Sequence, residues 1–421
     1  MNLIDVSAAY AEAGKVNANF SEVLSAFDSL DSRVTAIENS SNSGAAIYTS
    51  VKDFGAVGDG VADDTEAIQG AIAAATATGG VVWFPRGSYL SGPLSLYSNI
   101  TMDGEGRTAS IIKLKSGSEA TLLGRFSAAS NIHIRNLGLD GNKAGNLSAG
   151  HPVEFHGVTD SSITHCAIYN SRQNGIRWDG CTGNLIAFNQ VYGNTFCGIR
   201  CGETGTSVHT RIIGNYTLNN DVIGISVDSV SRFIISLNHS NNNGDNGIDL
   251  CASNQSSVTN NVCLSNTNQG IALDGWTYPG LNCDDNIVTG NVSMYNGQCG
   301  IDTANGNNRL IVTNNNLLNN GVLPFRDTGT GTKKRVNSNV GFITENSGSF
   351  QIPSGVTYVD VPHGLGINPE ERNVHVTRTS IGGSSTKYWI SNVGVSTFRV
   401  NVNIDPGPGG AWFNWMVVRA S

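Results

Sequence analysis

The chain has 421 residues, of which 51 are glycine and only 14% are charged, and its formal net charge is −8. That length is sufficient for one large hydrophobic core with appended segments. The acidic balance argues against nucleic acid as a partner, because phosphate binding requires a basic surface. No apolar run approaches the ~18 residues that a membrane-spanning helix requires. Residues 1–26 also lack the basic start and apolar block of a signal peptide.

Residues 1–44 are predicted to form an N-terminal helix that self-associates. Their apolar residues alternate at spacings of four and three, which is the a/d pattern of a coiled coil. These residues are Val16, Phe20, Val23, Phe27, Leu30, Val34 and Ile37. A helix docked on its own domain is the alternative, but the strict period favours a coiled coil.

Residues 51–106 carry a recognisable motif. They read Asp-Phe-Gly-Ala-Val-Gly-Asp-Gly from Asp53, then Asp-Asp-Thr-Glu-Ala-Ile from Asp63, an alanine-rich helix, and Val-Val-Trp-Phe-Pro-Arg-Gly from Val81. This segment resembles the N-terminal signature of the pectate-lyase-like superfamily, which is found in many bacteriophage tailspikes and capsule depolymerases. Asp63 or Asp64 is expected to cap the helix, and the helix to cover the open edge of the first coil.

A repeat of about 23 residues follows, and a fixed period of this kind indicates stacked supersecondary units. Its glycines, each before an isoleucine, are Gly175, Gly198, Gly224, Gly247, Gly270 and Gly300. Two further columns are predicted to stack by side-chain hydrogen bonds. The first holds Cys166, Asn189, Asn215, Asn238, Asn261 and Asn291, and the second Ser171, Asn194, Asn220, Asn243, Asn266 and Asn296.

The predicted fold is all-β. Residues 45–345 form a right-handed parallel β-helix, capped by 51–106, after the coiled-coil helix of 1–44. Residues 346–421 form a small β-sandwich-like domain for trimerisation or carbohydrate binding, since short alternating runs recur there. The eight cysteines are expected to be buried thiols rather than a disulfide or metal framework, because no pair of CxxC motifs occurs.

Candidate catalytic residues come from the strand after each repeat glycine, where positions two and four point outward if positions one and three fill the interior. Position two holds Arg177, Arg200, Ser226, Asp249, Ala272 and Asp302, and position four holds Asp179, Gly202, Asp228, Cys251, Asp274 and Ala304. The preceding coil adds Glu154 and His156. These columns are expected to form one solvent-facing surface.

Asp249 lies one coil and two residues from both Asp228 and Asp274, a backbone separation of about 8 Å. Inverting glycosidases hold their acid and base carboxyls about 6.5 to 9.5 Å apart. We therefore predict Asp228, Asp249 and Asp274 as the catalytic carboxylates, with Glu203 and Asp302 as further candidates. The alternative is that these aspartates are solvated residues on a strand face.

Substrate-binding candidates flank the carboxylates. An insertion after Asp274 carries Trp276 and Tyr278, whose rings suit stacking on sugars, although Trp276 is equally suited to anchor its loop. Arg177 and Arg200 suit a uronate carboxylate or pair with Asp179. Asp179 and His156 complete the set, and no metal site is predicted.

The sequence predicts a phage tailspike that binds and hydrolyses bacterial surface polysaccharide: capsule, exopolysaccharide or O-antigen. The resemblance implies a homotrimer, assembled in the host cytoplasm, joined through its N-terminus to a tail or baseplate protein in the virion. No cofactor is expected for an endo-acting hydrolase. One alternative is a uronate lyase with Ca²⁺ on the aspartates. The other is a non-catalytic receptor-binding or baseplate fibre.

Overall fold

The computed structural model describes residues 48–274, 282–303, 306–328, 331–342, 345–365, 369, 371–380 and 384–418, without the side chains of 203–206. The predicted coiled coil of 1–44, the side chain of Glu203, and Trp276 and Tyr278 therefore lie outside the described residues. Among the residues described, the only α-helix is α2 (Thr65–Thr78). No helix in this part of the chain is long and apolar enough to cross a membrane.

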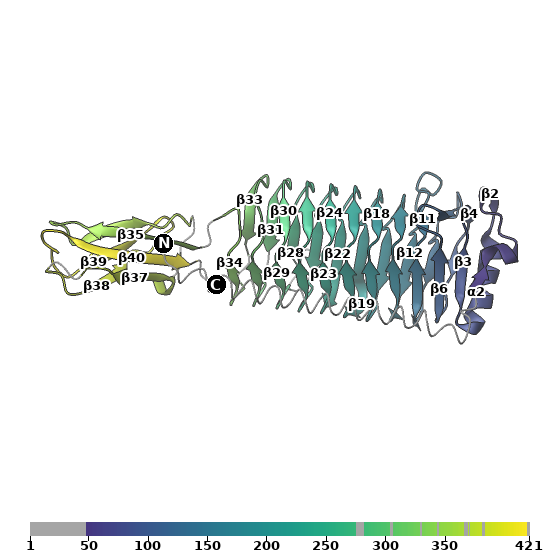
Figure 1. Ribbon diagram of the computed structural model, residues 1–421, viewed down its shortest axis with the longest axis horizontal. Coiled ribbons are helices and arrows are strands. Elements are labelled where there is room, and N and C mark those ends of the chain that lie inside the picture. Colours follow the sequence, from purple (N-terminus) through teal and green to yellow (C-terminus); the bar gives the residue numbers. More distant parts are fainter. Residues whose placement is uncertain are drawn as a thin grey trace. The chain divides into compact units, whose positions relative to one another are not determined.

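Three parallel sheets wind into a β-helix, as the fold prediction requires (Figure 1). Sheet A has 12 strands in the order β1 (Tyr48–Ser50), β3 (Val81–Phe84), β6 (Ile100–Gly104), β10 (Ile132–Arg135), β14 (Ser162–Thr164), β17 (Leu185–Ala187), β20 (Arg211–Ile213), β23 (Ile234–Ser236), β26 (Ser257–Thr259), β29 (Ile287–Thr289), β32 (Ile311–Thr313) and β34 (Arg335–Asn337).

Sheets B and C have 10 strands each. Sheet B contains β2 (Asp59–Asp63), β4 (Gly87–Ser91), β7 (Ser110–Leu114), β11 (Gly138–Asp140), β15 (Ala167–Tyr169), β18 (Gln190–Tyr192), β21 (Tyr216–Leu218), β24 (His239–Asn241), β27 (Val262–Leu264) and β30 (Val292–Met294). Sheet C contains β5 (Leu94–Ser95), β8 (Leu123–Arg125), β12 (Val153–His156), β16 (Ile176–Asp179), β19 (Ile199–Val208), β22 (Ile225–Ser231), β25 (Ile248–Cys251), β28 (Ile271–Asp274), β31 (Cys299–Thr303) and β33 (Leu323–Asp327). A two-stranded sheet pairs β9 (Ala129–Ser130) with β13 (Val158–Thr159).

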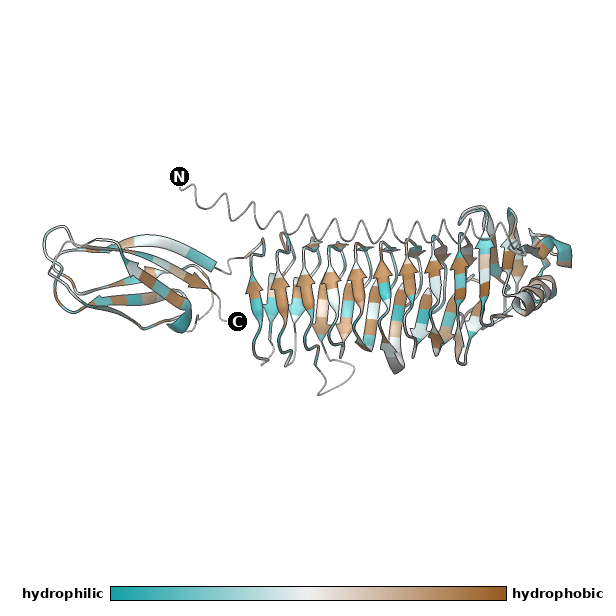
Figure 2. Cartoon of the chain, turned by 60° about the horizontal axis from the view of Figure 1, so that its bottom comes forward, coloured by the Kyte–Doolittle hydropathy of each residue, from teal (hydrophilic) through white to brown (hydrophobic). Residues whose placement is uncertain are grey.

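Alternation along each strand builds the core of the β-helix. In β22, Ile225 and Val227 are fully buried, and the equivalent residues of the neighbouring coils stack on them. Figure 2 shows the resulting bands of hydrophobic and hydrophilic residues along the strands. All eight cysteines are buried as thiols, which confirms the interpretation that they fill space.

The asparagine columns form the predicted ladders. Asn215 Nδ2 donates to Asn238 Oδ1 over 3.0 Å, and Asn238 Nδ2 donates to Asn261 Oδ1 over 3.0 Å. Each ladder asparagine in the first column follows a residue in the left-handed region, such as Phe188 with φ 58° or Leu237 with φ 57°. That conformation is costly for these residues, and the buried amide ladder offsets the cost. The same ladder continues beyond the predicted repeats to Asn315 and Asn339.

Helix α2 covers the first coil, as expected. It buries Ile68, Ala71, Ile72 and Ala75. Asp64 occupies the N-cap position of α2, as expected, but its carboxylate makes no capping hydrogen bond and instead accepts from the backbone N–H groups of Val57 and Gly58. Asp63 Oδ1 accepts from the backbone N–H of Thr65 at 3.2 Å.

The C-terminal strands form two antiparallel three-stranded sheets around their own core. Sheet D has the order β35 (Glu345–Ile352), β40 (Ala411–Val418), β37 (Val374–Arg378), and sheet E the order β36 (Tyr358–Pro362), β39 (Thr397–Val402), β38 (Tyr388–Ser391). The two sheets pack face to face, since Phe398 of sheet E meets Trp415 of sheet D with ring centroids 5.5 Å apart. This arrangement is the predicted sandwich-like fold.

Candidate functional site

Sheet C carries the described candidate residues on the outer positions of its strands. Asp249 on β25 pairs with Ser226 on β22 and Ala272 on β28. Cys251, two residues further on, pairs with Asp228 on one side and Asp274 on the other. Asp249 therefore lies diagonally between Asp228 and Asp274, as the repeat spacing predicts.

The expectation that this row is solvent-facing is wrong for most of its carboxylates. Asp179, Asp228, Asp249 and Asp302 are exposed by 1%, 3%, 9% and 7%, respectively, while Asp274 is half-buried. Three of the buried four have a physical explanation, because each contacts an arginine guanidinium that shields it from water. Arg177 Nε lies 2.9 Å from Asp179 Oδ2, Arg200 Nε 3.0 Å from Asp228 Oδ2, and Arg326 Nε 2.8 Å from Asp302 Oδ1.

Asp249 is the exception. Its Oδ1 is buried and has no hydrogen-bond partner among the described residues. Burial raises the pKa of Asp249 well above its usual value of 3.8, and the carboxylates of Asp274 and Asp228 raise it further. Because an isolated charge is costly to bury, Asp249 holds a proton at pH values where an ordinary aspartate has lost it.

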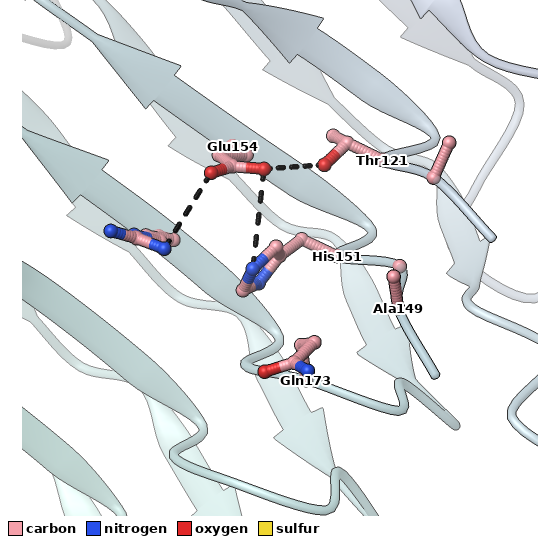
Figure 3. Close-up of a pocket in the computed structure, with 8 residues that line it drawn as sticks. Thr121, Ala149, His151, Glu154 and Gln173 are labelled. Atoms are coloured by element: carbon pink, nitrogen blue, oxygen red, sulfur yellow. Dashed lines mark hydrogen bonds and ion pairs between the residues drawn. The ribbon is translucent and has the colours of Figure 1, made fainter. Parts of the chain in front are cut away.

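A cavity of about 300 Å³ lies nearer the N-terminal end of sheet C (Figure 3). Its lining residues are Ala120, Thr121, Ala149, Gly150, His151, Glu154, Gln173 and Arg177. In Figure 3, the Glu154 carboxylate points toward both Thr121 and His151. Thr121 Oγ1 donates to Glu154 Oε2 at 2.5 Å, and the Nε2 atom of His156 lies 3.0 Å from Glu154 Oε1.

The Glu154 carboxylate has several polar partners around this cavity. Burial acts to raise the pKa of Glu154, but hydrogen bonds from Thr121 and His156 outweigh it and hold that pKa below its usual range. Arg177 Nη1 lies 3.7 Å from Glu154 Oε1. The same arginine also pairs with Asp179, so one guanidinium faces two carboxylates.

His151 is poised as a neutral base beside Glu154. Burial lowers the pKa of His151 below its usual range. Its Nδ1 lies 3.2 Å from the carbonyl oxygen of Asn174, and because a carbonyl only accepts, Nδ1 is assigned the proton. Its Nε2, 4.0 Å from Glu154 Oε2, then carries the lone pair in the neutral ring.

The described candidates thus fall into three groups. The first group, His156, Arg177 and Asp179, lies around the cavity. The second is Asp249 with its neighbours Arg200, Asp228 and Asp274. The third is Asp302, which is held by Arg326. Sequence reasoning placed Glu154 on this face without selecting it, and missed His151 and Thr121. His151 and Thr121 precede their strands, so no repeat position indicates them.

The calcium alternative requires several oxygen ligands close together on sheet C. No group of three or more His, Cys, Asp or Glu side chains among these residues has the arrangement to hold a metal ion. At Asp179, Asp228 and Asp302, an arginine guanidinium already contacts the carboxylate oxygens that a cation would require.

Known proteins share parts of this chain. It is 30% identical to mannuronan C5-epimerase AlgE1 of Azotobacter vinelandii over 243 residues, which is 54% of this chain and 16% of that protein. It is 41% identical to alginate lyase 7 of the same organism over 107 residues, or 22% of this chain and 12% of that protein. The chain therefore covers less than a fifth of the length of either relative.

Solved structures share the fold. The A-module of mannuronan C-5 epimerase AlgE4 from Azotobacter vinelandii matches with a TM-score of 0.59 and 23% identity, over 65% of this chain and 78% of that one. ORF18 of Geobacillus virus E2 matches with a TM-score of 0.64 and 17% identity, over 90% of this chain and 81% of that one. A family model described as "Rhamnogalacturonase A/epimerase, pectate lyase-like" matches residues 48–286, more than half of the chain. With its stacked parallel coils and capping helix, the chain belongs to this pectate-lyase-like family.

Proposed function

We propose that the chain is an endo-acting glycoside hydrolase that cleaves bacterial surface polysaccharide on sheet C. The observation that carries this proposal is the buried, unpartnered carboxyl of Asp249 beside the arginine-paired Asp228. Two carboxyls whose surroundings favour opposite protonation states are the mark of an acid/base pair. The family and its polysaccharide-modifying relatives support the substrate class.

Asp249 is the proposed general acid. It would donate its proton to the glycosidic oxygen as the bond to the anomeric carbon breaks. Its raised pKa lets it keep the proton to a higher pH than an ordinary aspartate does.

Asp228 is the proposed general base. The ion pair with Arg200 favours its ionised form, so it would accept a proton from the attacking water. Strand spacing and rise put the two backbone positions roughly 8 Å apart, which suits the inverting reaction. Asp274, diagonal to Asp249 on the other side, would keep the acid protonated.

The same proposal assigns the chain to a phage tail. Its fold similarity to ORF18 of Geobacillus virus E2 and the heptad pattern of residues 1–44 support a homotrimeric spike attached through the N-terminus. Light scattering of the full chain in solution tests the trimer.

The test compares two variants on a panel of purified bacterial polysaccharides that includes mannuronan. Asp249→Asn should lower kcat by roughly 10² to 10⁴, the usual contribution of a general acid. Asp285→Asn is the matched control, because this half-buried aspartate pairs with Arg309 and lies just before strand β29 of sheet A. Mass spectrometry of the products should show one added water per cleaved bond. Full activity in Asp249→Asn would refute the assignment, and binding without shortening would favour a receptor-binding fibre.

A second proposal concerns the cavity at Glu154, which suits uronate chemistry without hydrolysis. Arg177 would donate a hydrogen bond to the sugar carboxylate, and neutral His151 would take the proton from the adjacent carbon. Loss of the leaving sugar oxygen then gives an unsaturated product, whereas return of a proton to the opposite face gives an epimer. The similarity to mannuronan epimerases and an alginate lyase favours this candidate.

Deuterium separates the two proposals. Mannuronan incubated with the protein in D₂O should gain deuterium or unsaturated ends if the cavity is catalytic. His151→Gln should abolish that signal and Asp249→Asn should leave it intact. Water addition that depends on Asp249 alone would contradict the uronate proposal.

A further inference from the structure

The outer face of sheet E, remote in sequence from the candidate residues of sheet C, carries aromatic and polar side chains. One face of this sheet is buried in the C-terminal core through Val361, Phe398 and Val400. On the opposite face, Tyr358 pairs with Asn401, and Asn401 pairs with Trp389. The two aromatic side chains thus stand in one row across three strands, separated by one amide. Tyr358 is 47% exposed and Trp389 is 49% exposed.

A second row beside it is entirely polar. Asp360, Arg399 and Ser391 are cross-strand partners. Arg399 donates to both oxygens of Asp360, at 2.7 Å and 2.8 Å. Its guanidinium also lies 4.0 Å from the ring centroid of Tyr358, which fixes that ring in place.

The amide of Asn401 is oriented by the sheet itself. Its Nδ2 donates to Ser391 Oγ at 2.8 Å and to the backbone carbonyl of Trp389 at 3.3 Å. An amide held in this way between two rings presents its oxygen as a fixed acceptor. The surface therefore combines flat apolar faces with hydrogen-bonding groups whose positions are set before any ligand arrives.

This pattern fits a pyranose sugar better than a protein surface. A sugar ring presents C–H groups on one face, which stack on an aromatic ring, and hydroxyls around its edge, which bond to amides, carboxylates and guanidinium groups. A protein interface instead needs a contiguous apolar centre with a polar rim. Here the apolar groups are interrupted by Asn401 and bordered by the Asp360 and Arg399 pair.

The charge of the surface selects among sugars. Arg399 is the cation of these two rows and Asp360 is their anion, and each neutralises the other in the bidentate pair. A uronate would therefore meet no uncompensated positive charge on these rows. The hydroxyls of a neutral sugar can bind to such a surface, because they require hydrogen-bond donors and acceptors and no net charge.

We infer that the outer face of sheet E, formed by Tyr358, Asn401, Trp389, Arg399 and Asp360, is a binding site for neutral pyranose polysaccharide. The site does not depend on the proposed hydrolytic activity. It would hold the chain on a glycan surface while sheet C acts on its own substrate, so that binding survives when catalysis is removed.

Affinity gel electrophoresis of the full chain tests this inference, with dextran, galactomannan and hydroxyethylcellulose as neutral probes and alginate as the acidic comparison. At least one neutral polymer should retard the wild type. Trp389→Ala and Tyr358→Ala should each weaken that binding about tenfold or more, since a stacked ring contributes on the order of one such factor. Trp412→Ala is the matched control, because Trp412 is 46% exposed on sheet D.

Three outcomes would overturn the inference. The first is that none of the three neutral polymers retards the wild type. The second is that Trp412→Ala weakens binding as much as Trp389→Ala does. The third is that Trp389→Ala changes the oligomeric state by light scattering, which would make this face a contact between subunits. The variant Asp249→Asn should bind the neutral polymer as the wild type does. Failure of the hydrolase proposal can therefore be distinguished from failure of the binding inference.

Discussion

Asp249 and Asp302 occupy the same outward column of sheet C, with Ala272 between them, but their neighbours differ. Asp302 lies directly opposite Arg326 of the next coil and contacts it through both oxygens. Asp249 lies between Ser226 and Ala272, and neither can compensate a charge. The same position of the repeat therefore holds an ion-paired carboxylate in one coil, Asp302, and a carboxyl with a raised pKa in another, Asp249.

In a parallel β-helix, the residue one coil away therefore decides the chemistry of a side chain. Asp179 and Asp228 resemble Asp302, because each has a guanidinium within hydrogen-bonding distance. Buried ion pairs of this kind need not add net stability, but breaking one leaves an uncompensated charge. Three substitution experiments separate the two kinds of aspartate.

The largest contrast should be in stability at neutral pH. Asp302→Asn removes the partner of Arg326, whose side chain is 34% exposed, and we expect a loss of about 1 to 3 kcal/mol in the free energy of unfolding. Asp249→Asn removes a carboxyl that has no cation partner, so it should be neutral or stabilising. Calorimetric melting of both variants against wild type measures the difference. Equal destabilisation by the two substitutions would contradict the comparison.

The pH dependence of stability should distinguish the same pair. The pKa of Asp249 is raised in the folded chain above its usual value of 3.8. As pH rises past that value, the unfolded chain releases this proton while the folded chain retains it, so the contribution of Asp249 to stability falls. The fall is at most about 1.4 kcal/mol per pH unit, until the folded pKa is reached.

Melting temperatures at pH 4.5 and pH 7 test whether the contribution of Asp249 to stability falls as pH rises. As pH rises, the melting temperature of Asp249→Asn should increase relative to that of the wild type. Asp285→Asn is the matched control: because Arg309 lowers the pKa of Asp285, the difference in melting temperature between this variant and wild type should not move in favour of the variant as pH rises. A difference that stays constant, or that moves in favour of the wild type, would show that Asp249 is ionised in the folded chain.

The smallest expected effect is on the pH profile of the proposed hydrolysis. Asp274 raises the pKa of Asp249 and Arg200 lowers it. Asp274→Asn should therefore move the alkaline limb of kcat/KM to lower pH, and Arg200→Gln should move it to higher pH, each by roughly one unit. Shifts in the same direction for both variants would exclude Asp249 as the acid that this limb reports.

Much of the fold could be predicted because its signals are local. The asparagine columns repeat along the chain, and each ladder needs only the same residue one repeat later, as Asn215 and Asn238 show. The alternation in residues 398–402 likewise predicts strand β39, with Phe398 and Val400 inside and Arg399 outside. The motif at Asp53 and the repeats together indicate the family that the comparison over residues 48–286 establishes.

Less of the candidate site could be predicted. The repeat count places Asp228, Asp249 and Asp274 on one flank, but it does not say which of them is paired. Arg200 Nε lies 3.0 Å from Asp228 Oδ2 on the next coil, a contact that depends on how neighbouring coils are aligned. The cavity at His151 depends on loop residues that belong to no column.

The sequence by itself determined the period, the inward and outward sides of each strand, and the stacking of like residues, because all three follow from spacing along one chain. Only the tertiary structure decided which aspartates are buried, which pair with an arginine, and that Asp249 Oδ1 has no hydrogen-bond partner among the described residues. The physical reason is that the free energy of a buried carboxyl depends on groups within a few ångströms of it. In this fold those groups come from other coils, whose alignment is set by packing and by the insertions between them.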